Sequence, residues 1–215
     1  MSVFAEDGVT IAVPRGALFA GTLDLLEQLD VDVAEVRANE RRLVFPESGI
    51  VTMRPSDVPT YVEHGAADIG VTGKDVLLEQ PDREVYELLD LGYGWCRMIV
   101  ATRSGDDAMG ESLRRLGSVR VATKYPRVAA RHFASTGRQA EIVEVKGSVE
   151  LAPLTGLVDA IVDLTATGRT LAENRLEERE EIEVCTARLI ANPVAHKLKA
   201  GAIDTLADRM RATCA

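Results

Sequence analysis

The chain has 215 residues, enough for one large or two modest domains, and its hydrophobic (46%) and charged (27%) fractions are those of an ordinary globular protein. Its net charge of -9 at pH 7 argues against a large nucleic-acid-binding surface, and no apolar run is long enough for a membrane span. Because its first residues do not resemble an export signal, we expect a cytoplasmic protein that binds neither nucleic acid nor membrane.

Cysteine and histidine are scarce and scattered, with three of each in the whole chain. Their spacing predicts neither a disulfide framework nor a metal site held by protein ligands alone. Cys96 has no histidine near it in sequence that could act as a base, so its thiol alone favours a buried structural role.

The first half of the chain alternates short β-branched runs with segments of helical period, which is typical of an α/β protein with a largely parallel sheet. In chain order the pattern predicts a strand at 9–14, a helix after Gly16, a hairpin of strands 42–46 and 50–54, a helix capped by Asp57, a strand at 68–72, and a short helix from Gly73.

The second half predicts strands at 96–102, 119–124, 141–146 and 159–164, and a helix from Pro126 that ends at Gly137. The polar stretch 176–183 is interpreted as an exposed turn that leads into an edge strand. A final helix is expected from Val194 to Met210. Gly92 and Gly94 suggest a hinge, and no flexible linker is evident, so two domains would be joined by two crossings of the chain.

The most informative segment runs from a buried strand into a turn of small residues at 165–168 and a helix that begins near Arg169. Such a turn lets a phosphate group approach the backbone, and the Thr167 and Thr170 hydroxyls can add donors. Asp163, at the end of the strand, could accept hydrogen bonds from ribose hydroxyls. On this segment alone, a helix capped by Thr167 with nothing bound is an equal alternative.

Three arginines lie beside short strands and are candidates for clamping an anion. Arg15 precedes Gly16 in a strand-to-helix turn, and Arg42 and Arg54 flank the expected hairpin. A guanidinium fork suits a phosphate and a structural carboxylate equally well. A solvated arginine beside a helix start is the alternative for Arg15, and a structural ion pair is the alternative for Arg42 and Arg54.

Glu150 stands at the start of a helix after a Gly-Ser turn. Its carboxylate could complement the helix dipole, or it could help to position a magnesium–phosphate ligand through water.

Nine segments carry a family resemblance when they are taken together and in order. They are IAVPRG, RRL, RPSDVP, GAADIGVTGKDVL, DLGYGWCR, VATKYP, GSVELAP, GLVDAIVDLTATGRTL and ARLIAN. The set resembles the ATP phosphoribosyltransferases of histidine biosynthesis, in their short, catalytic-only form, since only one expected helix follows ARLIAN, where long-form members continue into a regulatory domain. Arg15 is a departure, because the family usually carries Lys there.

The resemblance implies an α/β fold with two domains, like type II periplasmic-binding proteins, with mostly parallel sheets and a ligand cleft between the domains. Domain I would comprise 1–94 plus 185–215, and domain II would comprise 95–184 and carry the loop that binds phosphoribosyl pyrophosphate (PRPP). The implied reaction joins N1 of the ATP adenine to C1 of PRPP and releases pyrophosphate, with Mg²⁺ bound to the substrate and no metal held by the protein.

The resemblance also assigns site residues. PRPP would be bound by Glu150, Asp163, Thr165, Ala166, Thr167, Gly168, Arg169 and Thr170, with Glu150 beside the ribose or its magnesium. ATP would be bound by Arg15, Gly16, Arg42, Arg54, Thr72, Gly73 and Cys96. Arg54, Arg15 and Arg42 would also be catalytic, because they would face ATP phosphates or the departing pyrophosphate.

Short-form members work with a regulatory subunit that resembles histidyl-tRNA synthetase, so we expect a hetero-oligomer with it. We also expect a homodimer formed through the final helix or an edge strand. Two rival interpretations are weighed against the transferase. A solute-binding domain would normally need an export signal, and a salvage-type phosphoribosyltransferase of unrelated fold would carry two adjacent acids before the turn, where this chain has only Asp163.

Overall fold

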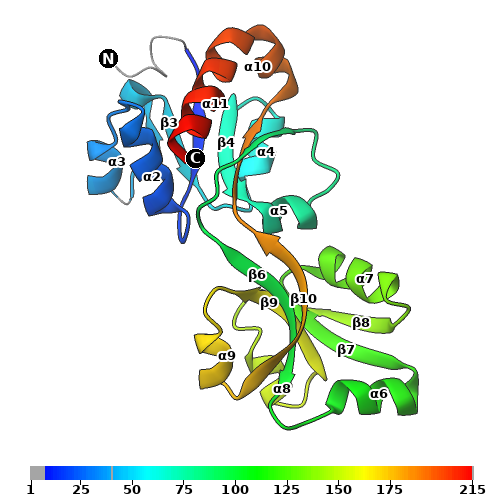
Figure 1. Cartoon of the computed structure of the whole chain (residues 1–215). Helices are drawn as coiled ribbons and strands as arrows, with labels where there is room; N and C mark the ends of the chain where they lie inside the picture. Colours follow the sequence, from blue (N-terminus) through cyan, green and yellow to red (C-terminus); the bar gives the residue numbers. More distant parts are fainter. Residues whose placement is uncertain (1–7, 40, 215) are drawn as a thin grey trace. The chain divides into compact units, whose positions relative to one another are not determined.

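The computed structural model describes residues 8–39 and 41–214, and the chain divides into two compact units (Figure 1). One unit contains Met1–Gly94 together with Thr186–Ala215, and the other contains Trp95–Cys185. The chain therefore passes from one unit to the other twice. No helix in the described part of the chain is long and apolar enough to cross a bilayer.

The first unit is built on a six-stranded sheet with the order β2-β3-β1-β4-β11-β5. Its strands are β1 (Ile11–Pro14), β2 (Val44–Phe45), β3 (Ile50–Met53), β4 (Ile69–Gly73), β5 (Tyr86–Asp90) and β11 (Ala187–Ala191). Parallel pairing joins β3, β1 and β4, whereas β2, β11 and β5 run antiparallel to their neighbours. The sheet is mixed rather than mostly parallel, because β2 pairs with β3 as an antiparallel hairpin and the returning strand β11 runs antiparallel to both β4 and β5.

Both faces of strand β1 are buried, which explains why all four of its residues are apolar. Ile11 and Val13 belong to the larger core cluster, and Ala12 belongs to a cluster with Val58 and Val62 of helix α4. The helices of this unit are α2 (Phe19–Gln28), α3 (Ala34–Ala38), the 3₁₀ helix η1 (Pro46–Ser48), α4 (Val58–Glu63), α5 (Lys74–Glu79), α10 (Pro193–Leu198) and α11 (Ala200–Cys214). Asp57 is the N-cap of α4, but its side chain makes no capping hydrogen bond, contrary to expectation.

The single final helix expected from the sequence was wrong, because the chain forms two helices that meet at Lys199. Lys199 leaves the helical region, with φ -120° and ψ 29°. Its Nζ lies 2.9 Å from Oδ2 of Asp68 and donates to the carbonyl of Gly8. The ion pair with Asp68, just before strand β4, stabilises the break between α10 and α11.

The second unit is built on a five-stranded sheet with the order β10-β6-β9-β7-β8. Its strands are β6 (Cys96–Arg103), β7 (Ser118–Thr123), β8 (Gln139–Glu144), β9 (Ala160–Thr165) and β10 (Leu176–Cys185), and its helices are α6 (Ala108–Leu116), α7 (Pro126–Ser135), α8 (Leu151–Leu154) and α9 (Arg169–Glu173). Strands β8, β7 and β9 are parallel, and β6 and β10 are antiparallel, so this sheet is mixed too.

The polar stretch 176–183 is not a turn, as the sequence suggested, but most of the edge strand β10. Its backbone pairs with β6 from Leu176 to Cys185, with two register irregularities. An edge strand has a neighbour on one side only, so its glutamates remain near solvent while the backbone is paired. A charged segment can therefore form a strand at this edge, although residues 176–183 lack the alternation of apolar and polar side chains that predicts a strand.

Candidate functional site

A pocket of about 200 Å³ lies at the carboxyl end of strand β9 in the second unit. Its lining consists of Glu150, Asp163, Leu164, Thr165, Ala166, Thr167, Arg169, Thr170 and Leu171. The structure therefore brings seven of the eight residues expected to bind PRPP into one pocket. The eighth, Gly168, belongs to the same turn but does not line the pocket.

The turn after β9 is held by hydroxyl groups and by one glycine. Oγ1 of Thr165 accepts a hydrogen bond from the Gly168 amide (3.0 Å), and Oγ1 of Thr167 accepts one from the Arg169 amide (3.4 Å). Gly168 is the N-cap residue of α9 and has φ 72°, a left-handed conformation that favours glycine. The helix therefore starts one residue later than capping by Thr167 would require.

Two amide groups of this turn are available to a ligand. The backbone N–H groups of Thr167 and Thr170 have no hydrogen-bond partner among the residues that the structure describes. The Thr165 and Thr167 hydroxyls accept backbone hydrogen bonds and still have their own hydrogens to donate. Amide and hydroxyl donors that converge on one turn are suited to a phosphate group.

Two carboxyl groups line the same pocket. Asp163 is only 8% exposed, and its Oδ1 accepts a hydrogen bond from the Leu164 amide (2.8 Å). Burial raises the pKa of Asp163 above its ordinary value, the Leu164 amide and Lys124 act against that rise, and Glu150 adds to it. Asp163 is thus a buried acceptor at the pocket wall, at the place where the sequence predicts contact with ribose hydroxyls.

Arg169 lines the pocket, but its guanidinium is engaged within its own helix. Its Nε donates to Glu173 one turn later (2.8 Å), and its side chain is 83% exposed. An exposed pair of this kind is weak, so it leaves the guanidinium free to exchange partners.

In the first unit, two of the candidate arginines emerge at the same edge of the sheet. Arg15 follows β1 and Arg54 follows β3, and these strands pair in parallel with Pro14 opposite Met53. The Arg15 amide donates to the Met53 carbonyl (2.7 Å). Parallel strands place their carboxyl ends together, which is where open α/β sheets bind ligands.

The three arginines differ in what their guanidinium groups contact. Arg15 donates from Nε to Oγ1 of Thr52 (3.0 Å) and from Nη2 to the Arg42 carbonyl (2.7 Å). Arg42 pairs with Glu35 and donates from Nε to the Val44 carbonyl (2.9 Å). Arg54 is exposed, and its guanidinium has no hydrogen bond or ion pair within the described residues. Arg15 and Arg42 are thus held together, whereas the Arg54 guanidinium is unpaired among the residues that the structure describes.

The other residues expected to bind ATP lie in different surroundings. Thr72 and Gly73 end β4, the parallel neighbour of β1, and the buried Thr72 hydroxyl donates to the Pro55 carbonyl (2.9 Å). Gly16 has φ 88° with open space where a Cβ would stand. Cys96 begins β6 in the second unit and is partly buried.

One charged residue beside the pocket was not among the sequence candidates. Lys124 follows strand β7, and its Nζ lies 4.0 Å from Oδ2 of Asp163. The signal that could have revealed it is its position at the carboxyl end of a predicted strand. Its use required knowing that β7 and β9 are neighbours, and strand order is not readable from local pattern.

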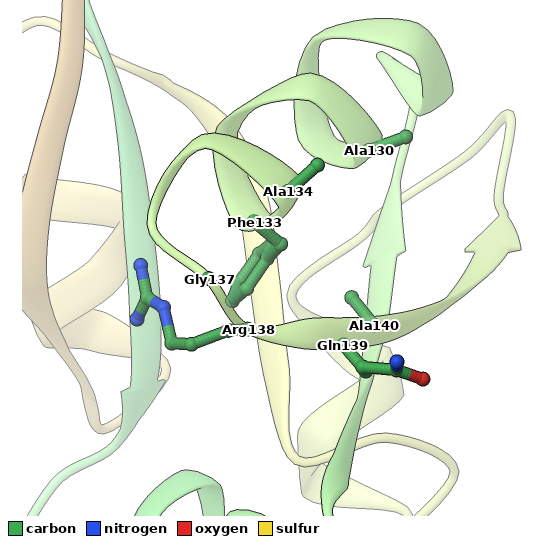
Figure 2. A pocket seen from close by; sticks show the side chains of 7 residues that line it. All are labelled: Ala130, Phe133, Ala134, Gly137, Arg138, Gln139 and Ala140. Atoms are coloured by element: carbon green, nitrogen blue, oxygen red, sulfur yellow. The ribbon is translucent and has the colours of Figure 1, made fainter.

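A larger hollow of about 460 Å³ lies between α7 and β8 (Figure 2). It contains none of the candidate residues, and its lining is Ala130, Phe133, Ala134, Gly137, Arg138, Gln139 and Ala140. The Arg138 guanidinium is bound to Glu180 through two hydrogen bonds of 2.5 and 2.6 Å. The Arg138 guanidinium is already paired, and the other lining side chains carry no positive charge, so this hollow is poorly suited to an anion.

Solved structures of low sequence identity share this fold. The aliphatic sulphonate binding protein SsuA from Escherichia coli superposes with a TM-score of 0.62 at 12% identity, covering 96% of this chain and 72% of its own. The L-arginine-bound protein Tv2483 gives 0.61 at 14% identity, covering 99% and 91%. The fold is thus that of type II periplasmic-binding proteins, as the sequence resemblance implied.

Higher similarity identifies the family. The family model described as ATP phosphoribosyltransferase matches residues 54–212. The ATP phosphoribosyltransferase of Rubrobacter xylanophilus is 52% identical over 195 residues (89% of this chain, 90% of that protein), and that of Bacillus subtilis is 44% identical over 206 residues (94% and 93%). The structure of the ATP phosphoribosyl transferase (HisG:HisZ) complex from Thermotoga maritima matches with a TM-score of 0.80 at 35% identity, covering 96% of this chain and 97% of that one.

The chain belongs to the ATP phosphoribosyltransferase family. The resemblance drawn from the nine sequence segments is confirmed, and the chain is a transferase. Family membership also decides against both rivals, the solute-binding domain and the salvage-type enzyme of unrelated fold.

Proposed function

We propose that this chain transfers the phosphoribosyl group of PRPP to N1 of ATP, releasing pyrophosphate and forming phosphoribosyl-ATP, the first step of histidine biosynthesis. The observation that carries the proposal is the pocket at the end of β9, which gathers seven of the residues expected to bind PRPP in a chain of this family.

PRPP would lie in this pocket with its 5-phosphate on the turn after β9. The free amides of Thr167 and Thr170 and the threonine hydroxyls would donate to the phosphate oxygens. Asp163 would accept hydrogen bonds from the ribose hydroxyls, and Glu150 would lie beside the ribose. The support for this placement is that hydroxyl donors and two carboxyl acceptors line the same small pocket.

The chemical step needs alignment and charge stabilisation rather than an activated side chain. The lone pair of adenine N1 forms a bond to C1 of the ribose, and the C1–O bond breaks with its electron pair leaving on pyrophosphate. Arg54 would donate to ATP phosphates or to the departing pyrophosphate, because its guanidinium is free among the described residues. Arg15 and Arg42 would serve the same anions from fixed positions, and Gly16, Thr72, Gly73 and Cys96 remain proposed ATP contacts.

Mg²⁺ would enter with the substrate. Among the described residues no group of three or more His, Cys, Asp or Glu side chains could hold a metal ion. A pocket that accepts an anion with its own counterion needs no such group. When bound to the pyrophosphate of PRPP, the ion would offset negative charge that grows as the C1–O bond breaks.

The assembly is also proposed. The related Thermotoga maritima structure is a HisG:HisZ complex, and we propose that this chain joins a HisZ-like subunit, which would resemble histidyl-tRNA synthetase and carry regulation. A homodimer of this chain stays a prediction, to be tested by light scattering. We place the reaction in the cytoplasm, where ATP and PRPP are available.

The direct test is to incubate the purified chain with ATP, PRPP and Mg²⁺, with and without the HisZ-like subunit, and to measure both products by chromatography and mass spectrometry. We expect phosphoribosyl-ATP and pyrophosphate in equal amounts, and neither when PRPP is omitted. Pyrophosphate release without phosphoribosyl-ATP, or no product in either mixture, would contradict the proposal.

A further inference from the structure

The carboxyl ends of β7 and β9 place a lysine opposite the buried acid of the pocket. The strands run parallel with Thr123 opposite Val162, so Lys124 and Asp163 are the next residues along each chain. Lys124 Nζ lies 4.0 Å from Oδ2 of Asp163. The lysine side chain is 42% exposed and that of Asp163 is 12% exposed. The ammonium group is therefore partly solvated, whereas the carboxylate is largely buried in the pocket wall.

The two carboxylates of the pocket would repel an anionic ligand, and the positive charge of Lys124 offsets part of that repulsion. Glu150 and Asp163 both line a space of about 200 Å³ that, under the proposed function, admits a polyanion. Buried negative charge would repel PRPP and is itself costly without a partner. Among residues 8–39 and 41–214, Lys124 is the cation within ion-pair distance of Asp163, while Arg169 of the same pocket is turned to Glu173.

Within the described part of the chain, no other cation lies within ion-pair distance of Asp163. Its register partner on β6 is Ile99, and its backbone neighbour Leu164 satisfies Oδ1 through an amide. Oδ1 thus accepts the Leu164 amide, and Oδ2 faces the Lys124 ammonium group.

We infer that Lys124 is a positioning residue for PRPP: its ammonium group offsets the charge of Asp163 and holds that carboxylate where it can accept the ribose hydroxyls. The inference rests on the proposed function and adds a residue to it. Lys124 acts through Asp163 and does not contact the reacting atoms, so its loss weakens PRPP binding rather than the chemical step.

The test compares Lys124→Met with Lys124→Arg, which keeps the charge, and with the control Lys146→Met. Lys146 follows the neighbouring strand β8, is 90% exposed and lies 3.8 Å from Glu144. It does not line the pocket, so its replacement removes the same charge without removing the partner of Asp163. We expect Lys124→Met to raise the Kd and KM for Mg²⁺–PRPP roughly five- to tenfold, as one partly exposed charge pair allows. Lys124→Arg should recover most of the affinity, and kcat and the KM for ATP should stay near wild type.

A double-substitution cycle with Asp163→Asn separates positioning from direct contact. If Lys124 acts through Asp163, Lys124→Met has little further effect on PRPP affinity in the Asp163→Asn background. An undiminished effect there would overturn the inference in favour of direct contact with PRPP. Equal PRPP affinity of wild type and Lys124→Met would also overturn the inference but would leave the proposed function intact.

If the wild-type chain does not bind PRPP, both the proposed function and this inference are rejected. Thermal unfolding of each variant shows that the comparison is made on folded protein.

Discussion

Arg54 differs from Arg15 and Arg42 in what its guanidinium contacts. Arg15 is tied to the Arg42 carbonyl and to Thr52, and Arg42 is tied to Glu35 and the Val44 carbonyl. Their replacement would disturb the local fold as well as any ligand. Arg54 makes no such contact within the described residues, so its replacement tests ligand binding and catalysis with little effect on folding.

We expect Arg54→Ala to lower kcat roughly 100-fold, as the loss of one donor to a developing anion does. Its free energy of unfolding should stay within about 0.5 kcal/mol of wild type, because the side chain is exposed and unpaired. Steady-state kinetics and denaturant unfolding measure the two quantities. Arg115→Ala removes another exposed arginine, from helix α6, and serves as the control. Unchanged turnover of Arg54→Ala would remove Arg54 from the mechanism.

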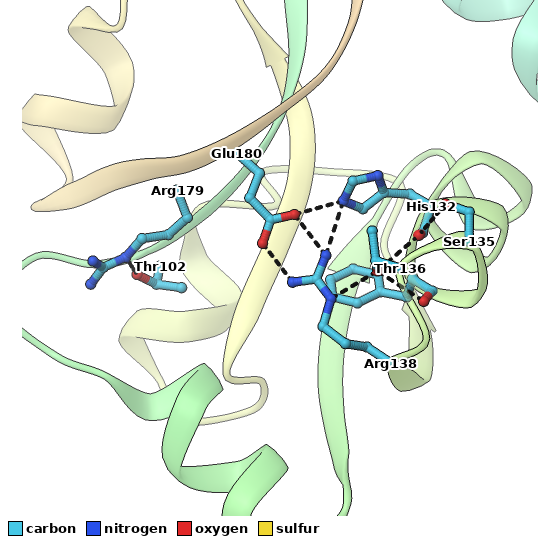
Figure 3. A network of polar contacts seen from close by, with 8 residues as sticks. Thr102, His132, Ser135, Thr136, Arg138, Arg179 and Glu180 are labelled. Atoms are coloured by element: carbon cyan, nitrogen blue, oxygen red, sulfur yellow. Dashed lines mark hydrogen bonds and ion pairs between the residues drawn. The ribbon is translucent and has the colours of Figure 1, made fainter.

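At the scale of elements, one carboxylate of strand β10 connects that strand to helix α7 and to the start of strand β8. Figure 3 shows the Glu180 carboxylate of β10 in contact with both His132 of α7 and Arg138, which directly precedes β8. Strands β10 and β8 are the two edges of the sheet. The Arg138 guanidinium binds both oxygens of Glu180 and lies over the Phe133 ring, 4.7 Å from its centroid. Helix α7 is thereby fastened across the sheet by a bidentate ion pair.

This network predicts a dependence of stability on pH. The Arg138 guanidinium, and then His132, hold the pKa of Glu180 below its usual range despite partial burial. A carboxyl group with a lowered pKa in the folded state stabilises the protein above its unfolded-state pKa, and this contribution is lost as pH falls through its folded-state pKa. Acidification should therefore weaken the attachment of α7.

We expect Glu180→Gln to lower the free energy of unfolding by about 2 kcal/mol near neutral pH, since it leaves Arg138 without its charged partner. The difference from wild type should shrink in acid, because protonation removes the same charge from the wild-type chain. Denaturant unfolding at several pH values measures this. Glu183→Gln on the same strand is the control, since Glu183 has no ion pair in the described structure. A difference that is constant across pH would contradict the assignment.

At the scale of the whole molecule, the candidate PRPP pocket lies entirely within one unit. Its lining runs from Glu150 to Leu171, inside Trp95–Cys185. A ligand that binds only the folded form stabilises the part of the protein that forms its site. PRPP should thus stabilise the second unit directly.

At a PRPP concentration of about 100 Kd, the free energy of unfolding of the second unit should rise by about 2.7 kcal/mol. Hydrogen exchange of the β9 amides, with and without Mg²⁺–PRPP, measures the rise. Asp163→Asn should greatly reduce it at the same PRPP concentration. Asp159→Asn, at the opposite end of β9, should leave it intact, because Asp159 accepts from the Arg120 amide away from the pocket. Equal protection in both variants would contradict a role for Asp163 in binding PRPP.

The sequence by itself determined the fold class, the family and most of the candidate pocket. Alternating apolar runs and turn glycines are local signals, and the segment from Asp163 to Thr170 is continuous, so its strand, turn and helix start could be predicted without knowing the rest of the fold.

Only the tertiary structure decided which distant residues meet. The mixed sheets, the strand at 176–185, the helix break at Lys199 held by Asp68, and the pair of Lys124 with Asp163 all depend on strand order or on contacts between distant segments. The same holds for the distinction between a free Arg54 and the engaged Arg15 and Arg42. The physical reason is the sequence separation over which each effect acts. Local propensity acts over one helical turn or a few strand residues. Ion pairs and strand pairing join residues that are far apart in sequence and meet only when the chain folds.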